Sequence, residues 1–461
     1  MIWNAYILFQ VFFTFLSVGY TEEMTEKETE YRVATTIHKI RQSPSINGSL
    51  RGIIYAGDVF EVGSVVGYKD CEAGWAEVSG GYVCLISTKK VEDKPKSLPS
   101  NLSVLPPSPD QEEETIIVAT EVDPAYMPTL HGKRDAEHKG RLWKSIESYE
   151  KGDSARWKLS LDRDYLFIAA HETKKGWVLE RPNGSIAPIS DVYLYPSSRF
   201  AGRDTEKFPI QEGAALAFVM KKEGVPLYWE PSKSADTLLT LEYRRSIDVQ
   251  KVSLDEAVVK DDQRGTEEKE KKETEAAEEW WEVPMGELVG YVPRSAIRLW
   301  KPLKKPKAIE DDEIWIDADI ETQMLAVMRG EIMLYLTLMS SAKKGHETPL
   351  GRYRIYDKST GWDLGSLDGA DDAYYMERVP YVMHYYPRYA IHSAFWHDNF
   401  GEPASHGCLN LSVKDARVVF DLVSPELPDG WRYVKQTNEH VGTAVRVRNG
   451  SKEGKSKIIG P

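Results

Sequence analysis

Short runs of alternating apolar and polar residues, each followed by turn residues, recur along most of this 461-residue chain. Residues 34–68 and 74–87 show the pattern clearly, with Gly, Pro, Asn and Ser between the runs. Alternation over strand-length segments favours antiparallel β-structure and leaves few places for long helices. The chain is also too long for one compact core. The sequence therefore predicts a mainly β, multidomain protein of three or four domains.

Charge limits the possible partners of the chain. The net charge is −13 at pH 7, and the sequence pI is about 5.4. Binding to phosphate backbones needs a basic surface. We therefore expect no nucleic acid partner.

The amino-terminal residues 1–19 have the form of a signal peptide. An apolar stretch from Ala5 to Leu16 precedes the small residues Ser17 and Gly19, as at a secretory cleavage site. No Lys or Arg precedes the apolar stretch, so a buried strand or an uncleaved anchor is the alternative. We expect export to the periplasm or cell envelope, followed by a charged tether over residues 20–33.

Three modules precede the carboxy-terminal part, and we expect flexible segments between them. The predicted boundaries are residues 34–92, a Pro- and acid-rich linker at 93–114, a β-rich module of unassigned function at 115–199, a module at 200–303 with a charged insertion at 261–279, and a linker at 304–312. The "AGDVFEV" and "GWAEVSGGYVCL" segments of the first module resemble bacterial SH3-like β-barrels. The third module repeats this pattern, with Trp280–Trp281 at the place of Gly74–Trp75. The resemblance implies anchoring to the cell wall.

The carboxy-terminal block, residues 313–438, begins with three alternating runs that predict an antiparallel meander. Near its end, Ser412 stands three residues before Asp415 and an amphipathic run, which is typical of a helix amino-cap. We assign residues 439–461 to a carboxy-terminal tail.

A cluster of histidines and a cysteine lies within residues 391–410, and it has three interpretations. His392, His397, His406 and Cys408 could bind a metal, but their spacings of five, nine and two match no usual zinc pattern. Each could instead fill a local structural site. A thiol nucleophile needs a base, a group that orients the base, and amide donors where charge develops. His392, sixteen residues before Cys408, and the turn-forming Gly407 could supply these, although spacing alone does not select this interpretation. We predict no metal and no cofactor.

The remaining cysteines support a special role for Cys408. Cys71 and Cys84 lie thirteen residues apart in one small module, so they are candidates for a disulfide in an exported protein. Cys408 is then left unpaired, and an odd cysteine in an exported protein is a candidate reactive thiol.

The cluster resembles the signature of the L,D-transpeptidase (YkuD-type) catalytic domain. His392 is followed by Ser405-His406-Gly407-Cys408-Leu409-Asn410, and "WIDADIETQMLAVMRG", "TPLGRYRI" and "VPYVMHYYPRYAIHSAFWH" match the family in order. The resemblance implies a β-sandwich-like catalytic domain with a short helix after the nucleophile. It covers residues 313–438 and says nothing secure about the upstream modules.

The resemblance also implies roles for individual residues. Cys408 would attack a peptidoglycan stem peptide, His392 would transfer protons, and the carbonyl of Ser393 would orient His392. The N–H groups of Gly407 and Cys408 would face the oxyanion. A thiol–imidazole pair can also hold part of its population as thiolate and imidazolium. Other candidates have supporting or substrate-binding roles: His406, Asn410, Trp396 and Tyr381.

The reaction implied is transfer of a stem peptide to an amine acceptor, either another strand or a wall-linked protein. Carbapenem β-lactams are expected as covalent inhibitors. Two alternatives stay open: an L,D-carboxypeptidase or endopeptidase that uses the same site, and a non-catalytic scaffold that binds the wall.

Overall fold

The computed structural model describes residues 30–92, 94, 130–196, 198–252, 278–366 and 374–454. The predicted signal peptide, residues 95–114 of the first linker and residues 261–277 of the charged insertion lie outside the described residues. Within those ranges the chain is mainly β, as the sequence predicted. The described helices include none that is long and apolar enough to cross a bilayer.

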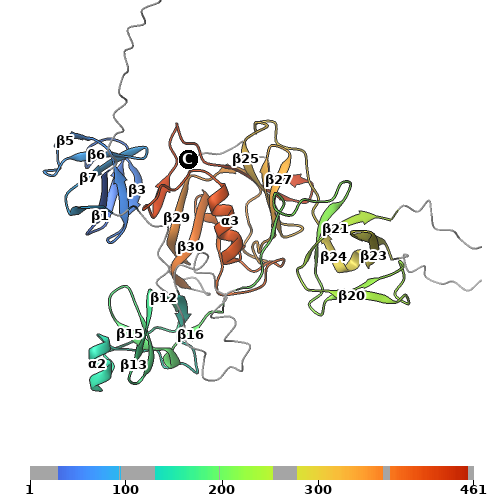
Figure 1. Cartoon of the computed structure of the whole chain (residues 1–461), viewed down its shortest axis with the longest axis horizontal. Coiled ribbons are helices and arrows are strands. Elements are labelled where there is room, and N and C mark those ends of the chain that lie inside the picture. Colours follow the sequence, from blue (N-terminus) through green and yellow to red (C-terminus); the bar gives the residue numbers. More distant parts are fainter. Residues whose placement is uncertain are drawn as a thin grey trace, which may run out of the picture.

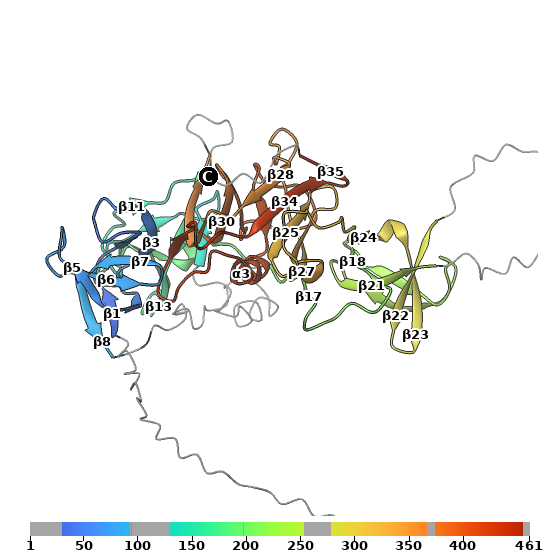
Figure 2. The ribbon, with the colours of Figure 1, turned by 90° about the horizontal axis from the view of Figure 1, so that it is seen from above.

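The carboxy-terminal domain lies between the first and third modules in both views of the chain (Figures 1 and 2). Its strands and helix are β25 (Ile314–Asp319), β26 (Met324–Arg329), β27 (Ile332–Leu338), β28 (Gly351–Arg354), β29 (Asp357–Gly365), β30 (Tyr375–Tyr386), β31 (Tyr389–Ser393), β32 (Leu409–Leu411), α3 (Val413–Leu422), β33 (Tyr433–Lys435), β34 (Ala444–Asn449) and β35 (Lys452–Glu453). The predicted meander is confirmed, since β25, β26 and β27 pair antiparallel in sequence order.

Two sheets and α3 enclose the main core of this domain. One sheet has the order β17 (Arg203–Asp204)-β27-β26-β25-β34-β28, and the other contains β29, β30, β31, β32 and β33. Apolar residues of both sheets meet, including Ile316, Val327, Met383 and Ile391, each fully buried. The predicted cap of α3 is confirmed, because the Asp415 N–H donates to Ser412 Oγ at 3.0 Å.

The boundary predicted at residue 438 is wrong. Strand β34 pairs parallel with β25 and antiparallel with β28, so the supposed tail contributes a central strand. Its Arg446 and Arg448 are buried and form ion pairs with the buried Asp317 of β25. The charges of these arginines are neutralised by buried carboxylates inside the fold.

The first module is built from eight short strands: β1 (Glu30–Ala34), β2 (His38–Arg41), β3 (Leu50–Ile54), β4 (Val59–Val62), β5 (Val65–Gly67), β6 (Trp75–Val78), β7 (Gly81–Cys84) and β8 (Thr88–Val91). Cys71 and Cys84 form a disulfide with a Cα–Cα distance of 5.8 Å. Residues 30–33, which we assigned to the tether, belong to β1, which pairs with β4 and β8. The SH3-like assignment stays a prediction.

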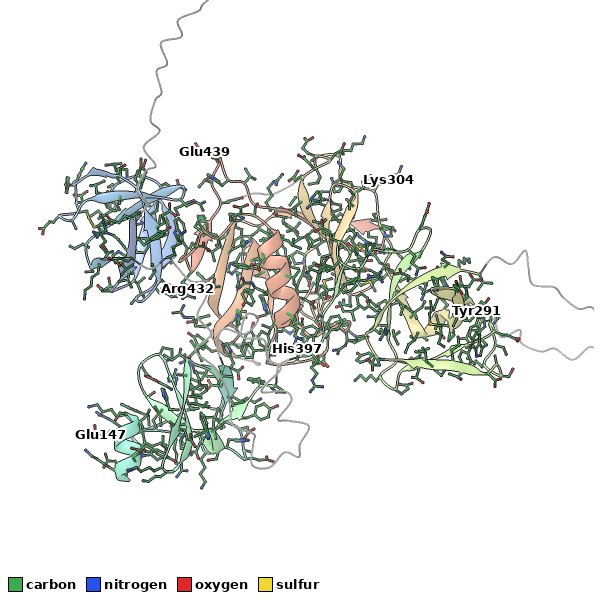
Figure 3. All side chains as sticks on the ribbon, in the orientation of Figure 1. Glu147, Tyr291, Lys304, His397, Arg432 and Glu439 are labelled. Carbon is green, nitrogen blue, oxygen red and sulfur yellow. A yellow bond between two sulfur atoms is a disulfide. The ribbon has the colours of Figure 1, made fainter. Side chains whose placement is uncertain are left out.

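This module is docked on the carboxy-terminal domain rather than held by a flexible segment. Strand β3 pairs antiparallel with β33, and Trp431 is buried in the same core as Ile40 and Phe60. Arg432 forms an ion pair with Asp58 across this interface, where Figure 3 labels it. The sheet of the carboxy-terminal domain therefore continues into the first module.

The second module extends the same sheet at its other end. Its elements are β9 (Leu130–Lys133), β10 (Arg141–Leu142), α2 (Ile146–Lys151), β11 (Trp157–Lys158), β12 (Arg163–Phe167), β13 (Ala169–Thr173), β14 (Gly176–Glu180), β15 (Ile186–Pro188), a 3₁₀ turn η1 (Ile189–Asp191) and β16 (Tyr193–Leu194). The Asn183–Gly184 hairpin signal is confirmed, since β14 pairs antiparallel with β15. Strand β12 pairs parallel with the start of β30, and Glu377 of β30 forms an ion pair with Arg181.

The third module begins inside the sheet of the carboxy-terminal domain. Its elements are β17 (Arg203–Asp204), β18 (Ala215–Val219), β19 (Val225–Tyr228), β20 (Thr237–Leu241), β21 (Ser246–Lys251), β22 (Trp280–Met285), β23 (Leu288–Pro293), a 3₁₀ turn η3 (Arg294–Ala296) and β24 (Ile297–Leu299). Strand β17 pairs with β27. The predicted linker at 304–312 is also packed, because Ile309 is buried and the Lys304 carbonyl accepts from Arg446 at 2.8 Å.

Candidate active site

The pairing of two parallel strands brings the Cα atoms of His392 and Cys408 near each other. The register of β31 and β32 pairs His392 with Asn410, and Cys408 lies at the bend two residues before Asn410. One strand spacing and two residues of rise separate the two Cα atoms by roughly 8 Å. At this separation a thiol and an imidazole can reach each other.

The surroundings of His392 set its tautomer and its charge. The ring is buried, and Nδ1 lies 2.9 Å from the Ser393 carbonyl oxygen. A proton on Nδ1 donates to this carbonyl, which leaves Nε2 as the acceptor. Burial lowers the pKa of His392 to about 4, so the imidazole is a neutral base at pH 7. The Trp396 ring lies 5.8 Å from the imidazole, centroid to centroid.

Cys408 is also neutral in the resting chain. Its side chain is partly exposed, and it is the one free cysteine among the described residues. Burial of the sulfur raises the pKa of Cys408 to about 11, although the Ala390 N–H opposes this by donating toward the thiolate. The sulfur lies 3.9 Å from the Arg388 carbonyl oxygen. The expected resting population of thiolate and imidazolium is therefore not favoured, because both charged forms are desolvated.

The turn before Cys408 is tightly determined. Gly407 has φ +131°, and a Cβ there would lie 2.7 Å from Cε1 of Tyr389. The Gly407 N–H donates to Ser405 Oγ at 3.0 Å, and the Ser405 hydroxyl donates to the Cys408 carbonyl at 2.6 Å. The local serine turn therefore occupies the Gly407 N–H in the resting chain, and the predicted role of this group as an oxyanion donor stays a prediction. The prediction for the Cys408 N–H stays a prediction.

The other predicted site residues lie in different surroundings in the folded chain. Asn410 is buried on the same side as His392, and its Nδ2 lies 3.0 Å from Nε2 of His397. His406 is exposed, and its ring lies 4.5 Å from that of His346, centroid to centroid. Tyr381 is fully buried and packs on Phe420 of α3. Its assignment as a wall for the substrate is therefore wrong.

Sequence reasoning missed residues that hold the catalytic turn. Thr348 Oγ1 donates to the Gly407 carbonyl at 2.9 Å, and Tyr389 packs against the face of Gly407 that lacks a side chain. Thr348 is the threonine of the "TPLG" segment, so its hydroxyl was the available signal. For Tyr389 the sequence offered no signal, because the contact depends on the fold.

The loop between His392 and Cys408 is held from outside the carboxy-terminal domain. His131 of the second module stacks on Phe395 at 4.0 Å between ring centroids. Arg244 of the third module forms an ion pair with Asp398 at 2.8 Å. Figure 3 labels the neighbouring His397 in this part of the domain. The upstream modules therefore contact the same loop that carries Trp396.

Comparison with known proteins finds a family model that matches this domain. Residues 313–447 match the model of the L,D-transpeptidase catalytic domain, YkuD. The matched range includes most of β34, in agreement with the corrected boundary. A putative L,D-transpeptidase, YciB of Bacillus subtilis (strain 168), is 24% identical over 123 residues, which are 25% of this chain and 63% of that protein. The chain thus spans less than two thirds of this curated relative.

Solved structures with detected similarity carry the same family name. L,D-transpeptidase 3 from Mycobacterium tuberculosis, in complex with a faropenem-derived adduct, is 20% identical, covers 35% of this chain and 73% of its own, and has a TM-score of 0.24. The catalytic domain of the L,D-transpeptidase from E. faecium is 23% identical, covers 30% of this chain and 97% of its own, and has a TM-score of 0.24.

Proposed function

We propose that this chain, whose residues 313–447 form an L,D-transpeptidase-type catalytic domain, is a cysteine-dependent L,D-transpeptidase that acts on peptidoglycan stem peptides. The observation that supports the proposal is the register of β31 and β32, which pairs His392 with Asn410, two residues after Cys408. The Ser393 carbonyl orients His392 so that Nε2 is available as a base.

The first half-reaction starts from a neutral thiol and a neutral imidazole. Cys408 Sγ attacks the carbonyl of the third residue of a stem tetrapeptide, while its proton passes to Nε2 of His392. The carbon–nitrogen bond to the terminal D-alanine then breaks, and His392 returns the proton to the leaving amine. Proton transfer during attack avoids a desolvated thiolate as a resting species.

Amide donors would stabilise the charge that develops on the carbonyl oxygen. The Cys408 N–H is one proposed donor. The Gly407 N–H becomes a second donor only if it leaves Ser405 Oγ, a bond of 3.0 Å in the resting chain. Loss of one donor of this kind typically raises the barrier by about 2.7–4 kcal/mol. Release of the Gly407 N–H from Ser405 Oγ would therefore have a large effect on the rate.

The setting of the reaction is the cell envelope. Residues 1–19 would direct export, and the upstream modules would bind the wall while they support the catalytic loop. Carbapenems would acylate Cys408, because a strained amide is attacked by the same thiol. In the second half-reaction an amine acceptor would resolve the thioester and form a cross-link.

Purified protein incubated with stem tetrapeptide, followed by mass analysis of the products, tests this proposal. Cross-linked dimers are expected from the wild type, none from Cys408→Ala, and a loss of at least 100-fold from His392→Ala. His440→Ala changes an exposed histidine outside the site and serves as the matched control. Trimmed tripeptide without dimers would favour the hydrolase instead. Full turnover by Cys408→Ala would refute the assignment.

A further inference from the structure

A second histidine lies near Cys408 in the sheet. The register pairs His384 of β30 with Ala390 of β31, and the next strand pairs Ile391 with Leu409. His384 and Ala390 therefore project from neighbouring strands to one side, and the Ala390 N–H donates toward the Cys408 sulfur. Two strand spacings separate the outer Cα atoms by roughly 10 Å. Ala390, between them, contributes only a methyl group.

His384 is oriented in the way that acid–base histidines are oriented. Its Nδ1 lies 2.7 Å from Oδ1 of Asp357, and Oδ2 of Asp357 accepts from the Tyr433 hydroxyl at 3.0 Å. Asp357 is buried, so its negative charge favours a proton on Nδ1 and leaves Nε2 as a proton acceptor. The ring packs between Tyr356 and Trp362, at 5.9 Å and 5.4 Å between centroids.

A charge on His384 changes the pKa of His392. Burial is the main cause of the low pKa of His392, and a positive charge on His384 lowers it further. Burial also raises the pKa of Tyr356, which stacks on His384, to about 12, and the charges of Asp357 and Cys408 add to this. His384, His392 and the Cys408 sulfur therefore lie close enough for their charges to affect the same group of side chains. A histidine that only filled space between two aromatic rings would not need the buried carboxylate.

We propose that His384, oriented by Asp357, accepts the first proton of the amine that resolves the thioester, which makes it the acceptor-side base of this enzyme. The inference rests on the proposed function and refines it, because it names a protonated amine as the co-substrate. His392 alone provides one proton-transfer site, whereas an incoming ammonium must lose two protons before an amide is formed.

The protons balance as follows. The ammonium gives one proton to Nε2 of His384, which releases it to solvent. The free amine attacks the thioester carbonyl, a carbon–nitrogen bond forms, and the carbon–sulfur bond breaks. The second proton passes through His392 to the departing sulfur, so the net products are an amide, the Cys408 thiol and one proton in solution. Water as the acceptor needs no prior deprotonation, so hydrolysis bypasses His384.

Single-turnover measurements on the full-length protein test this step. Stem tetrapeptide forms the acyl-enzyme, which is then mixed with ethanolamine, an ammonium at neutral pH, or with hydroxylamine, largely a free base there. Mass analysis separates the ethanolamide, the hydroxamate and the hydrolysed tripeptide. His384→Gln should slow ethanolamide formation at least tenfold relative to acylation, and hydroxamate formation and hydrolysis by less than threefold.

The pH dependence gives a readout that a purely structural role would not change. The deficit of His384→Gln with ethanolamine should shrink as pH rises and more amine becomes free base. Other groups that face His384 also titrate or carry charge, namely Asp357, Tyr356, Tyr433, Lys435, His392 and Cys408. The comparison is therefore made as a ratio to wild type at each pH.

Two further variants complete the experiment. His138→Gln in the second module is the matched control, because Nδ1 of His138 also lies 2.7 Å from a carboxylate, that of Asp135, and it should leave all three products unchanged. Asp357→Asn should also slow ethanolamide formation, but by less than His384→Gln does. This variant keeps the test valid if His384→Gln does not fold. Equal losses with both nucleophiles, or no loss, would overturn the inference while the proposed function stands. Absence of an acyl-enzyme in the wild type would overturn both.

Discussion

The resting charge of Cys408 can be measured through its reaction with iodoacetamide as a function of pH. Only the thiolate reacts, and the chain has three cysteines, of which Cys71 and Cys84 are bonded to each other. Burial raises the pKa of Cys408 from 9.0 to about 11. At pH 7 about one thiol in 10⁴ is then ionised, roughly 100-fold fewer than for a cysteine of pKa 9.0.

The alkylation rate of Cys408 should therefore rise about tenfold per pH unit between pH 7 and 10 and level off near pH 11. Intact-mass spectra at timed intervals measure this rate. Because the buried His392, with a pKa of about 4, is neutral throughout this range, His392→Ala should leave the slope unchanged. The same cysteine in denaturant should react with an ordinary profile. A rate that levels off below pH 8 in the folded protein would show a thiolate–imidazolium pair and refute this reasoning.

Three further outcomes are expected from the contacts described above. Gly407→Ala should reduce turnover at least tenfold and stability by about 1–3 kcal/mol, because φ is +131° and the new Cβ meets Tyr389; kinetics and urea unfolding measure the two effects. Trp431→Ala should cost about 3–5 kcal/mol and expose the first module to limited proteolysis, and an unchanged digestion pattern would contradict the docking. Asp415→Ala should lower the free energy of unfolding by about 3 kcal/mol or more, since this buried carboxylate accepts from the Tyr335 hydroxyl at 2.6 Å; an unchanged thermal midpoint would contradict it.

Much of the candidate site could be predicted because it is encoded locally. The interval from His392 to Cys408, the glycine between them and the cap at Ser412 are short-range patterns with a direct structural meaning. The roles of Cys408, His392 and the Ser393 carbonyl came instead from the resemblance to the L,D-transpeptidase signature, because spacing alone left other interpretations open.

The errors came from contacts between distant parts of the chain. Tyr381 is aromatic and close in sequence to the cluster, yet it faces α3 and is fully buried. His384 was passed over because its carboxylate partner lies 27 residues away in the neighbouring strand.

The sequence by itself determined the β character of this protein and the short helix that follows Ser412, because alternation and capping act over a few residues. Its resemblance to the L,D-transpeptidase signature singled out Cys408 and His392 as the proposed thiol and base. Only the tertiary structure decided that the upstream modules are docked, that β34 pairs with β25 and β28 in the other sheet of the catalytic domain, and that His384 contacts Asp357. A strand can pair with any of many similar strands, and a charged side chain is buried only where an oppositely charged group is buried beside it. Neither choice can be read from a single strand.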